Sequence, residues 1–258
     1  MILLLGGTSD TAPIARGLAG LKIPVLVSTA TRIKLNVGDH DLIHRHCGCL
    51  DSSGLSALIQ KHHIRMMVDA THPYAVNVSQ NAGEVARKLD IPLLVFARPE
   101  SDVAHQDIIL AADHLDAAQK AFVPGKPVLL TTGSRNLAPY VQASTQTGQP
   151  LTARILDGKT ARKDAYAQGL LDGHLICERG PFSVEQNLAH IRLSDAGVMV
   201  TKDGGTAGGL PEKLEAAKQS KCLVVMVQRP PINGCEQIVC KDYESLIRKV
   251  QKRYNASV

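Results

Sequence analysis

The chain has 258 residues, of which 44% are hydrophobic and 21% are charged, with a net charge of +5. This composition predicts a folded globular protein and excludes a disordered chain. Aromatic residues make up only 3%, so base stacking is poorly provided for, and nucleic acid is not an expected partner. The modest positive charge suits a small polyanionic ligand better.

No apolar run approaches the roughly 20 residues that span a bilayer, so we expect no membrane association. Met1–Leu5 continues directly into Gly6–Asp10 without a basic n-region or cleavage site, which indicates a first strand and not a signal peptide. We therefore expect a cytoplasmic protein. In that compartment the six scattered cysteines favour reduced core residues over a disulfide framework.

Short apolar runs alternate with amphipathic stretches in the first part of the chain, which is typical of βα units around a parallel sheet. The predicted strands are Ile2–Leu5, Pro24–Ser28, Leu42–Cys47, Met66–Val68 and Pro92–Phe96. Arg98–Gln106 is rich in Pro, Ser, Asp and His and interrupts this rhythm. We place the domain boundary there.

A second series of strands follows the boundary. The predicted strands are Ile108–Leu110, Val128–Leu130, Leu151–Leu156, Leu175–Cys177, Val198–Val200 and Leu223–Val227. The tail, Tyr243–Tyr254, has the pattern of a basic amphipathic helix. The sequence thus predicts an α/β protein of two Rossmann-like domains, with mainly parallel sheets and an interdomain cleft. They are residues 1–98 and residues 99–258, and the packing of the tail helix (241–254) is left open.

The two halves resemble each other weakly. LLLGGTS parallels VLLTTGS, VDATHPYA parallels VTKDGGTA, and LLVFARP parallels VVMVQRP. Gene duplication would produce these pairs, but so would chance, because strand ends in α/β proteins are regularly small and polar.

The most informative stretch is Val200–Leu210, VTKDGGTAGGL, which joins an apolar strand to a helical pattern that resumes at Pro211. A glycine loop between strand and helix lets backbone N–H groups approach an anion, and the helix dipole favours negative charge there. Thr201, Gly204 and Gly205 are therefore candidate ligand-binding residues. Lys202 adds a mobile charge and a candidate proton donor.

Gly6-Gly7-Thr8-Ser9 follows the first strand, where Rossmann-like domains hold dinucleotide phosphates. The turn lacks the full G-x-G-x-x-G spacing, and its alternative role is a tight turn with Thr8 or Ser9 as helix N-cap. The second strand ends in Ser28-Thr29-Ala30-Thr31-Arg32, without a carboxylate until Asp39. Hydroxyls and one guanidinium suit a ribose phosphate, so we expect NADPH, with NADH as the alternative.

Asp69-Ala70-Thr71-His72-Pro73-Tyr74 follows the fourth strand and is expected to line the same edge. His72 could transfer protons, or Asp69 could simply cap the turn beside it. In the second half, Thr132-Gly133-Ser134 and Arg179-Gly180 each follow a strand and offer groups suited to carboxylates. Arg98 and Arg229 stand in matching strand-end Arg-Pro pairs, as cleft cations or structural arginines.

His44-Arg45-His46-Cys47-Gly48-Cys49 suggests a metal site. However, alternation along a strand would direct the two histidines and the two cysteines to opposite faces, so they could not converge on one tetrahedral ion. We expect no metal.

Taken together, these motifs resemble one family, precorrin-6A reductase and its cobalt-precorrin-6A counterpart from the corrin pathway to vitamin B12. The segments that carry the resemblance are Gly6–Asp10, Asp69–Ala75, Ala97–Pro99, Thr131–Leu137, Arg179–Phe182 and Thr201–Gly209. They span nearly the whole chain in the family's order. One departure is Asp10, where the family usually has Glu.

The resemblance implies an oxidoreductase that saturates one ring double bond of a polycarboxylated tetrapyrrole, converting a 6A precorrin to its 6B form with a nicotinamide cofactor. Hydride goes to one carbon and a proton to its neighbour. We expect NADPH to contact Gly6, Gly7, Thr8, Ser28, Thr29, Ala30, Thr31, Arg32, Asp69, Ala70, Thr71 and His72. We expect the substrate to contact Tyr74, Thr132, Gly133, Ser134, Arg179, Gly180, Thr201, Gly204, Gly205 and Arg229. Lys202 is the catalytic candidate, as proton donor or carboxylate anchor, and water is the alternative proton source.

Other corrin-pathway enzymes are candidate partners. Two other functions stay open at this point. One is a cofactor-free tetrapyrrole lyase like uroporphyrinogen-III synthase, which would need no phosphate turn. The other is a non-catalytic nucleotide- or metabolite-binding module, which would bind ligand without oxidising NADPH.

Overall fold

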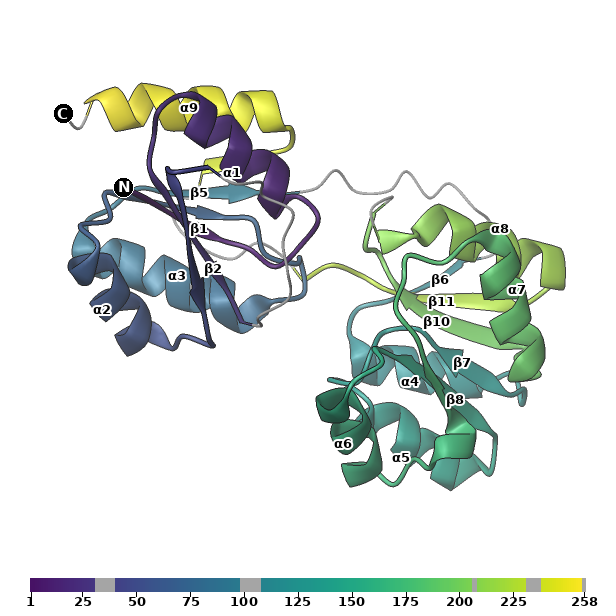
Figure 1. The fold of residues 1–258 in the computed structure, drawn as a ribbon. Coiled ribbons are helices and arrows are strands. Elements are labelled where there is room, and N and C mark those ends of the chain that lie inside the picture. Colours follow the sequence, from purple (N-terminus) through teal and green to yellow (C-terminus); the bar gives the residue numbers. More distant parts are fainter. Residues whose placement is uncertain (31–39, 98–107, 206–207, 231–237, 257–258) are drawn as a thin grey trace. The chain divides into compact units, whose positions relative to one another are not determined.

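The computed structural model describes residues 1–30, 40–97, 108–205, 208–230 and 238–256. The chain divides into two compact units (Figure 1). Unit 1 comprises Met1–Pro99 and Pro231–Val258, and unit 2 comprises Glu100–Pro230. In the part of the chain that the structure describes, each unit contains one six-stranded sheet in which every strand pair is parallel. The predicted α/β class with two parallel sheets is confirmed.

Unit 1 has the strand order β12-β5-β4-β1-β2-β3. Its elements are β1 (Ile2–Leu5), α1 (Thr11–Gly20), β2 (Val25–Thr29), β3 (Ile43–Cys47), α2 (Ser52–Lys61), β4 (Met66–Asp69), α3 (Val76–Leu89), β5 (Leu93–Phe96), β12 (Ile238–Cys240) and α9 (Tyr243–Ala256). Ile2 and Leu4 of β1 pack in a core with α1 and α9, whereas Leu3 and Leu5 pack in a second core with α2 and α3. Helices therefore cover both faces of the sheet (Figure 1).

Unit 2 has the strand order β6-β11-β10-β7-β8-β9. Its elements are β6 (Ile108–Ala111), α4 (His114–Phe122), β7 (Val128–Leu130), α5 (Ala138–Thr147), β8 (Leu151–Ile155), α6 (Lys159–Ala167), a 3-10 turn (Asp172–His174), β9 (Leu175–Cys177), α7 (Val184–Leu193), β10 (Val198–Lys202), α8 (Leu210–Ser220) and β11 (Leu223–Val227). A core under α7 and α8 includes Leu129, Met199 and Val224 of three neighbouring strands.

The two sheets share one topology. The order β3-β2-β1-β4-β5-β12 corresponds to β9-β8-β7-β10-β11-β6, and the three sequence pairs noted above follow the equivalent strands β1 and β7, β4 and β10, and β5 and β11. The outermost strand differs in origin. In sequence β6 follows β5 but pairs with β11, and β12 follows β11 but pairs with β5. The sheet of unit 2 thus begins in sequence with its edge strand β6, whereas the sheet of unit 1 receives its edge strand β12 only after the chain has passed through unit 2.

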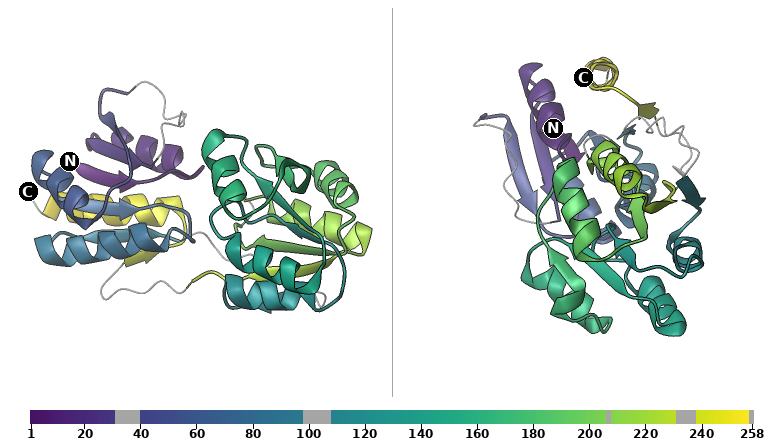
Figure 2. Two further views of the ribbon diagram at one scale, coloured as in Figure 1. Left: turned by 90° about the horizontal axis from the view of Figure 1, so that it is seen from below. Right: turned by 90° about the vertical axis from the view of Figure 1, so that its right-hand side faces the viewer.

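This exchange corrects the division of the chain at residue 99. The segment after 231 belongs to unit 1, and α9, which the sequence left unplaced, packs there beside α1. Leu246 and Val250 of α9 are fully buried in the same core as Ile2. Figure 2 shows the N-terminus and the yellow helix α9 in one unit. The sequence could not assign the tail because an amphipathic helix reveals an apolar face but not the sheet that the face covers.

None of the helices within the described ranges combines the length and the apolar character that crossing a bilayer requires.

Candidate functional site

In unit 1 the strand order reverses between β1 and β4. The chain proceeds from β1 to β2 and β3 on one side and then returns to β4 on the other. Ligands of open α/β sheets bind outside the carboxyl ends of the strands at such a switch point. The turns Gly6–Asp10 and Asp69–His72 follow these two strands, so the structure brings both predicted segments to the same edge.

The turn after β1 is shaped by two glycines and Thr11. The Thr11 hydroxyl accepts hydrogen bonds from the N–H groups of Gly7 (3.0 Å) and Thr8 (3.2 Å). A Cβ on Gly6 would lie 2.4 Å from Cγ2 of Thr11, so only glycine fits beside this side chain. Gly7 has φ +117°, and nothing lies within 4 Å of a Cβ placed there. The backbone of Gly7 therefore has open space beside it, just before the start of α1.

The turn after β4 is organised by Asp69. Its carboxylate accepts from the Thr71 N–H (2.9 Å), the Thr71 hydroxyl (2.7 Å) and the Ser79 hydroxyl (2.6 Å). Asp69 is buried and so acts as a local organiser, while the more exposed Thr71 and His72 present themselves at the edge. The His72 and Tyr74 rings lie 5.5 Å apart. The two turns are joined by the Thr8 hydroxyl, which donates to the Ala70 carbonyl at 3.1 Å.

The end of β2 is only partly described. Ser28 and Thr29 are buried; the Ser28 hydroxyl contacts His46 Nδ1 (3.3 Å), and Thr29 Oγ1 contacts Cys47 Sγ (3.8 Å). Ala30 is exposed. Thr31 and Arg32, expected to bind the ribose phosphate, lie outside the described residues. Their role stays a prediction.

In unit 2 the order reverses between β7 and β10. Thr131–Ser134 follows β7, and Thr201–Gly205 spans the last residues of β10 and the loop after it, so the predicted residues again meet at one switch point. The Thr131 hydroxyl donates to the Val200 carbonyl (2.9 Å) and joins the two strand ends. Oγ1 of Thr132 is buried and has no hydrogen-bond partner among the described residues, which is an uncommon state for a hydroxyl. The Ser134 hydroxyl donates to Asp164 of α6 (3.3 Å).

The glycine loop after β10 is held by an ion pair. Nε of Arg229 lies 3.0 Å from Asp203 Oδ2 and donates to the Asp203 carbonyl at 3.1 Å, while Asp203 Oδ1 accepts from the Gly205 N–H at 3.1 Å. Both side chains are nearly buried, at 11% and 9% exposure. Arg229, expected to bind substrate, therefore lies beside the loop and secures it.

Lysines and arginines converge on this edge of unit 2. Burial and the nearby Arg135 lower the pKa of Lys202 to about 8. Burial, Arg154 and Lys202 lower the pKa of Lys213 to about 8, against an opposing effect of Glu212. The Lys213 amine donates to the Gly208 carbonyl at 3.2 Å, so it lies at the glycine loop. Ammonium groups held this close to other cations form a site of positive potential that favours anions.

His114 lies near Lys202 at the same edge. Its Nδ1 lies 2.8 Å from the Tyr140 hydroxyl and its Nε2 lies 3.0 Å from Asn136 Nδ2. Burial lowers the pKa of His114 to about 4, with Lys202 acting in the same direction and Asp113 opposing. The imidazole is therefore neutral near pH 7. Burial raises the pKa of Tyr140, so its phenol stays protonated.

The turn Arg179–Phe182 follows β9 and approaches the glycine loop. A Cβ on Gly209 would lie 3.9 Å from the Cβ of Pro181. Arg179 and Gly180 are exposed, whereas the Phe182 ring is half-buried and packs against the buried guanidinium of Arg154 at 4.1 Å. Unit 2 therefore brings the predicted Thr132–Ser134, Thr201–Gly205 and Arg179–Gly180 to one edge of its sheet.

Sequence reasoning missed Lys213, Arg154 and His114. Lys213 lies in the second turn of a helix and Arg154 inside a strand, where a charged residue normally signals solvent exposure. His114 follows the helix cap Asp113, whose carboxylate accepts from two backbone N–H groups. One available signal was the position of Lys213 directly after the glycine loop, in the first turns of α8.

The helices that follow the four central strands share one property. The residues at the N-caps of α1, α3, α5 and α8 make no side-chain capping hydrogen bond, and the same is true of Gly158 before α6. By contrast, Asp51, Asp113 and Ser183 cap α2, α4 and α7. The helix dipole favours negative charge at these N-termini.

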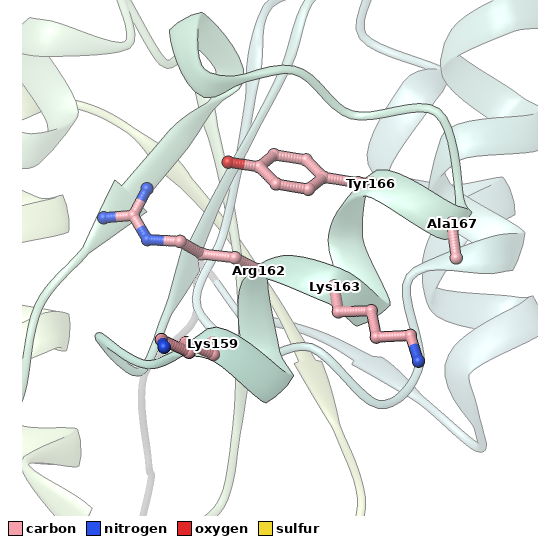
Figure 3. A pocket seen from close by; sticks show the side chains of 5 residues that line it. All are labelled: Lys159, Arg162, Lys163, Tyr166 and Ala167. Carbon is pink, nitrogen blue, oxygen red and sulfur yellow. The ribbon is translucent and has the colours of Figure 1, made fainter.

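A separate hollow of about 540 Å³ lies on α6 (Figure 3). It is lined by Lys159, Arg162, Lys163, Tyr166 and Ala167. Arg162 pairs with Asp157 and Asp172 at 3.4 and 3.3 Å, and Tyr166 donates to Asp172. Lys159 and Lys163 are exposed, unlike Lys202 and Lys213. These residues provide controls for the cations of the switch point.

Within the described ranges no group of three His, Cys, Asp or Glu side chains could hold a metal ion. Cys47 and Cys49 are free thiols at the surface, outside the core. The reason is that β3 is an edge strand with little covering it. Cys222 and Cys240 are buried as expected.

Two doubly wound α/β units, with a glycine turn at one switch point and a cation-lined glycine loop at the other, define a two-domain α/β protein with a Rossmann-like first unit. The sequence pattern of the family Precorrin-6x reductase CbiJ/CobK matches residues 1–251. The chain belongs to this family. It is therefore an oxidoreductase of corrin biosynthesis that acts on a CH–CH group, which excludes the lyase and the non-catalytic module.

Relatives align over almost their whole length. The chain is 32% identical to a cobalt-precorrin-6A reductase of Methanocaldococcus jannaschii, covering 96% of this chain and 97% of that protein. It is 31% identical to a precorrin-6A reductase of Rhodococcus erythropolis, covering 92% of each. The structure of CobK precorrin-6A reductase matches with a TM-score of 0.77 and 22% identity over 97% of this chain and 96% of that one, so the fold is shared. A reductase of this family implies a nicotinamide cofactor.

Proposed function

We propose that the chain uses NADPH to reduce one ring double bond of precorrin-6A or cobalt-precorrin-6A to the 6B form. Unit 1 binds the reduced dinucleotide and unit 2 binds the carboxylates of the tetrapyrrole. Membership of the family shows the class of reaction; separate roles for the two units are proposed in addition. It is supported by the contrasting chemistry of the two switch points.

The observation that carries the substrate half is the group of cations in unit 2. Lys202 and Lys213 have pKa values of about 8 because burial and neighbouring cations disfavour their charged forms. The carboxylates of a polycarboxylated ring would offset the repulsion between these cations. In return, the ammonium and guanidinium groups would donate hydrogen bonds to the carboxylates and replace the water that these lose on binding. Thr132 adds a buried hydroxyl that lacks a partner in the described protein, suited to donate to a carboxylate.

The cofactor half is supported by the turn after β1. Gly7 leaves room for a phosphate beside the backbone, and the N-terminus of α1 has no side-chain cap among the described residues. When bound, NADPH supplies the hydride. Gly6, Gly7 and Thr8 would hold its pyrophosphate, and Thr71 and His72 would line the same edge. Ser28 to Arg32 would hold the ribose phosphate.

Lys202 is the proposed catalytic residue. Its amine is protonated below a pKa of about 8 and can therefore give a proton near neutral pH, whereas an ordinary lysine gives one only under alkaline conditions. The same charge can anchor a substrate carboxylate. His114 is neutral and both of its ring nitrogens have protein partners, so it would shape the site without adding charge.

The test is anaerobic turnover with purified precorrin-6A and its cobalt form. Loss of reduced-nicotinamide absorbance together with a product that has gained two hydrogen atoms is expected for at least one of them. Arg32→Ala should reduce the preference for NADPH over NADH. An unchanged preference would refute the assignment of Arg32, and NADPH oxidation without ring reduction would refute the proposed reaction.

A further inference from the structure

Arg154 of β8 is a charged side chain in the interior of unit 2, with 5% exposure. Among the described residues no carboxylate lies at ion-pair distance from it. Its Nη1 instead donates to two neutral groups of α7, Asn187 Oδ1 (2.8 Å) and His190 Nδ1 (3.0 Å). Burial lowers its pKa to about 10, and the more distant Glu178 opposes this. Keeping such a charge is costly, so it calls for a reason beyond packing.

The hydrogen-bond pattern fixes the state of His190. Because Arg154 can only donate, Nδ1 of His190 must accept and its proton must lie on Nε2. Nε2 faces Glu178 Oε2 at 3.2 Å, so His190 donates there. Burial and Arg154 lower the pKa of His190, and this outweighs Glu178. The chain Arg154–His190–Glu178 thus attaches the first residue of the turn after β9 to the unit's interior.

The other end of the same turn is attached to the same guanidinium. Nδ2 of Asn187 donates to the carbonyls of Phe182 (3.3 Å) and Ser183 (2.8 Å). The Arg154 guanidinium lies over the Phe182 ring at 4.1 Å, and the other ring neighbour is His190 at 5.3 Å. Both ends of the turn, residues 178 and 182–183, are therefore tied to Arg154.

Phe182 in turn supports the middle of the turn. A Cβ on Gly180 would lie 2.9 Å from Cε2 of the ring, so Gly180 packs directly on it. Arg154 therefore contacts Phe182, and Phe182 contacts Gly180. Arg179, beside Gly180, is exposed at the end of this series.

We propose that Arg154 is a positioning residue that fixes the turn Glu178–Phe182 so that Arg179 binds a carboxylate of the substrate. The proposal rests on the proposed function, in which unit 2 binds the tetrapyrrole, and on the substrate contact that the sequence predicts for Arg179 and Gly180. Arg154 does not touch the substrate. It acts through its cation–π contact with Phe182 and its hydrogen bonds to Asn187 and His190.

The test is a double-mutant cycle of Arg154→Met and Arg179→Ala, measured as KM for the tetrapyrrole. Met keeps the packing against Phe182 and removes the charge and the hydrogen bonds, and exchanges of buried charge for apolar bulk are often tolerated. We expect each single variant to raise KM about tenfold with little change in kcat, and the double variant to be no worse than Arg179→Ala. Phe182→Leu, which removes the ring from beneath Gly180, should reproduce the effect. Arg162→Met, which changes a surface arginine of α6, is the matched control and should leave KM unchanged.

The outcomes are distinguishable. Multiplying effects of Arg154→Met and Arg179→Ala, or an unchanged KM in a folded Arg154→Met or Phe182→Leu protein, would overturn the positioning role. An unchanged KM in Arg179→Ala alone would instead refute the proposed contact of Arg179 with the substrate. Calorimetric binding of NADPH serves as a reference for folded protein and should be equal in all variants.

Discussion

The two switch points of this protein have the same topology and opposite chemistry. In unit 1 the turns after β1 and β4 present glycine backbone and hydroxyls, and the nearby carboxylates of Asp10 and Asp69 are hydrogen-bonded to Tyr243 and to Thr71 and Ser79. In unit 2 the equivalent edge carries Lys202 and Lys213, whose pKa values are depressed. Backbone amides suit phosphates, and mobile cations suit carboxylates.

The difference shows how one scaffold can serve two ligands. The strand order and the parallel pairing specify where a ligand can bind in each unit, and the residues after the central strands specify which ligand it is. The matching motif pairs lie on equivalent strands, as a duplication predicts.

The largest expected effect comes from breaking the glycine loop of unit 2. Asp203→Ala leaves the nearly buried Arg229 without its carboxylate and should lower the free energy of unfolding by about 3 kcal/mol, measured by urea denaturation. Substrate affinity should fall and NADPH affinity should not. Asp157→Ala, which removes a surface partner of Arg162, is the control and should change stability by less than about 1 kcal/mol. Equal losses in the two variants would contradict the buried role of the Asp203–Arg229 pair.

The matching change in unit 1 is Gly6→Ala. The new Cβ would press on the buried Thr11, whose hydroxyl holds Gly7 and Thr8, so we expect a loss of about 2 kcal/mol in the free energy of unfolding. Calorimetry should show weaker NADPH binding with substrate binding retained. Gly20→Ala in α1 meets nothing within 4 Å and is the matched control. NADPH affinity that survives Gly6→Ala would separate the turn from the cofactor.

Lys202→Ala tests the cation of unit 2 directly. We expect kcat/KM to fall at least tenfold, or about 1.4 kcal/mol, because the variant loses both a carboxylate anchor and the proposed proton donor. Lys163→Ala, an exposed lysine of α6, should be neutral. A steady-state assay in which the two variants behave alike would remove Lys202 from the site.

The smallest effect is the pH dependence. Lys202 and Lys213 lose their protons as the pH rises through about 8, so KM for the tetrapyrrole should rise about fourfold between pH 7 and about pH 8.5 for each of the two lysines that pairs with the substrate. The stability of the free protein should increase over the same pH range in which the affinity for substrate falls. Unfolding restores the ordinary lysine pKa, so between the two pKa values the unfolded chain binds more protons and the free energy of unfolding rises with pH. Lys202→Ala should flatten the KM profile; an identical profile would assign the titration to other groups.

Much of this arrangement can be predicted from the sequence because it is local. Each apolar run from Ile2–Leu5 to Leu223–Val227 forms a strand, and the loops after β1, β4, β7 and β10 reach the expected edges. What could not be predicted depends on packing between distant segments. The strand Ile238–Cys240 was not predicted, and its partner β5 lies far away in sequence.

The burial of charged residues inside strands and helices was also not predicted from the sequence. Arg154 and Lys213 resemble solvent-facing positions of a strand and a helix, and only the tertiary structure shows that Arg154 is buried and Lys213 partly buried. For Asp69 and Arg229 the sequence left a structural role open beside ligand contact; their described contacts hold the loops, and their contact with ligands stays a prediction. A strand-end position predicts the neighbourhood of a charged side chain, but not whether it faces ligand or protein.

The most direct measurement is a crystal structure of the chain soaked with NADP⁺. The account predicts that the pyrophosphate lies against the backbone of Gly6, Gly7 and Thr8 at the β1–β4 switch point. A pyrophosphate held instead by Gly204 and Gly205 beside Lys202 would contradict it, because unit 2 would then be the cofactor-binding half.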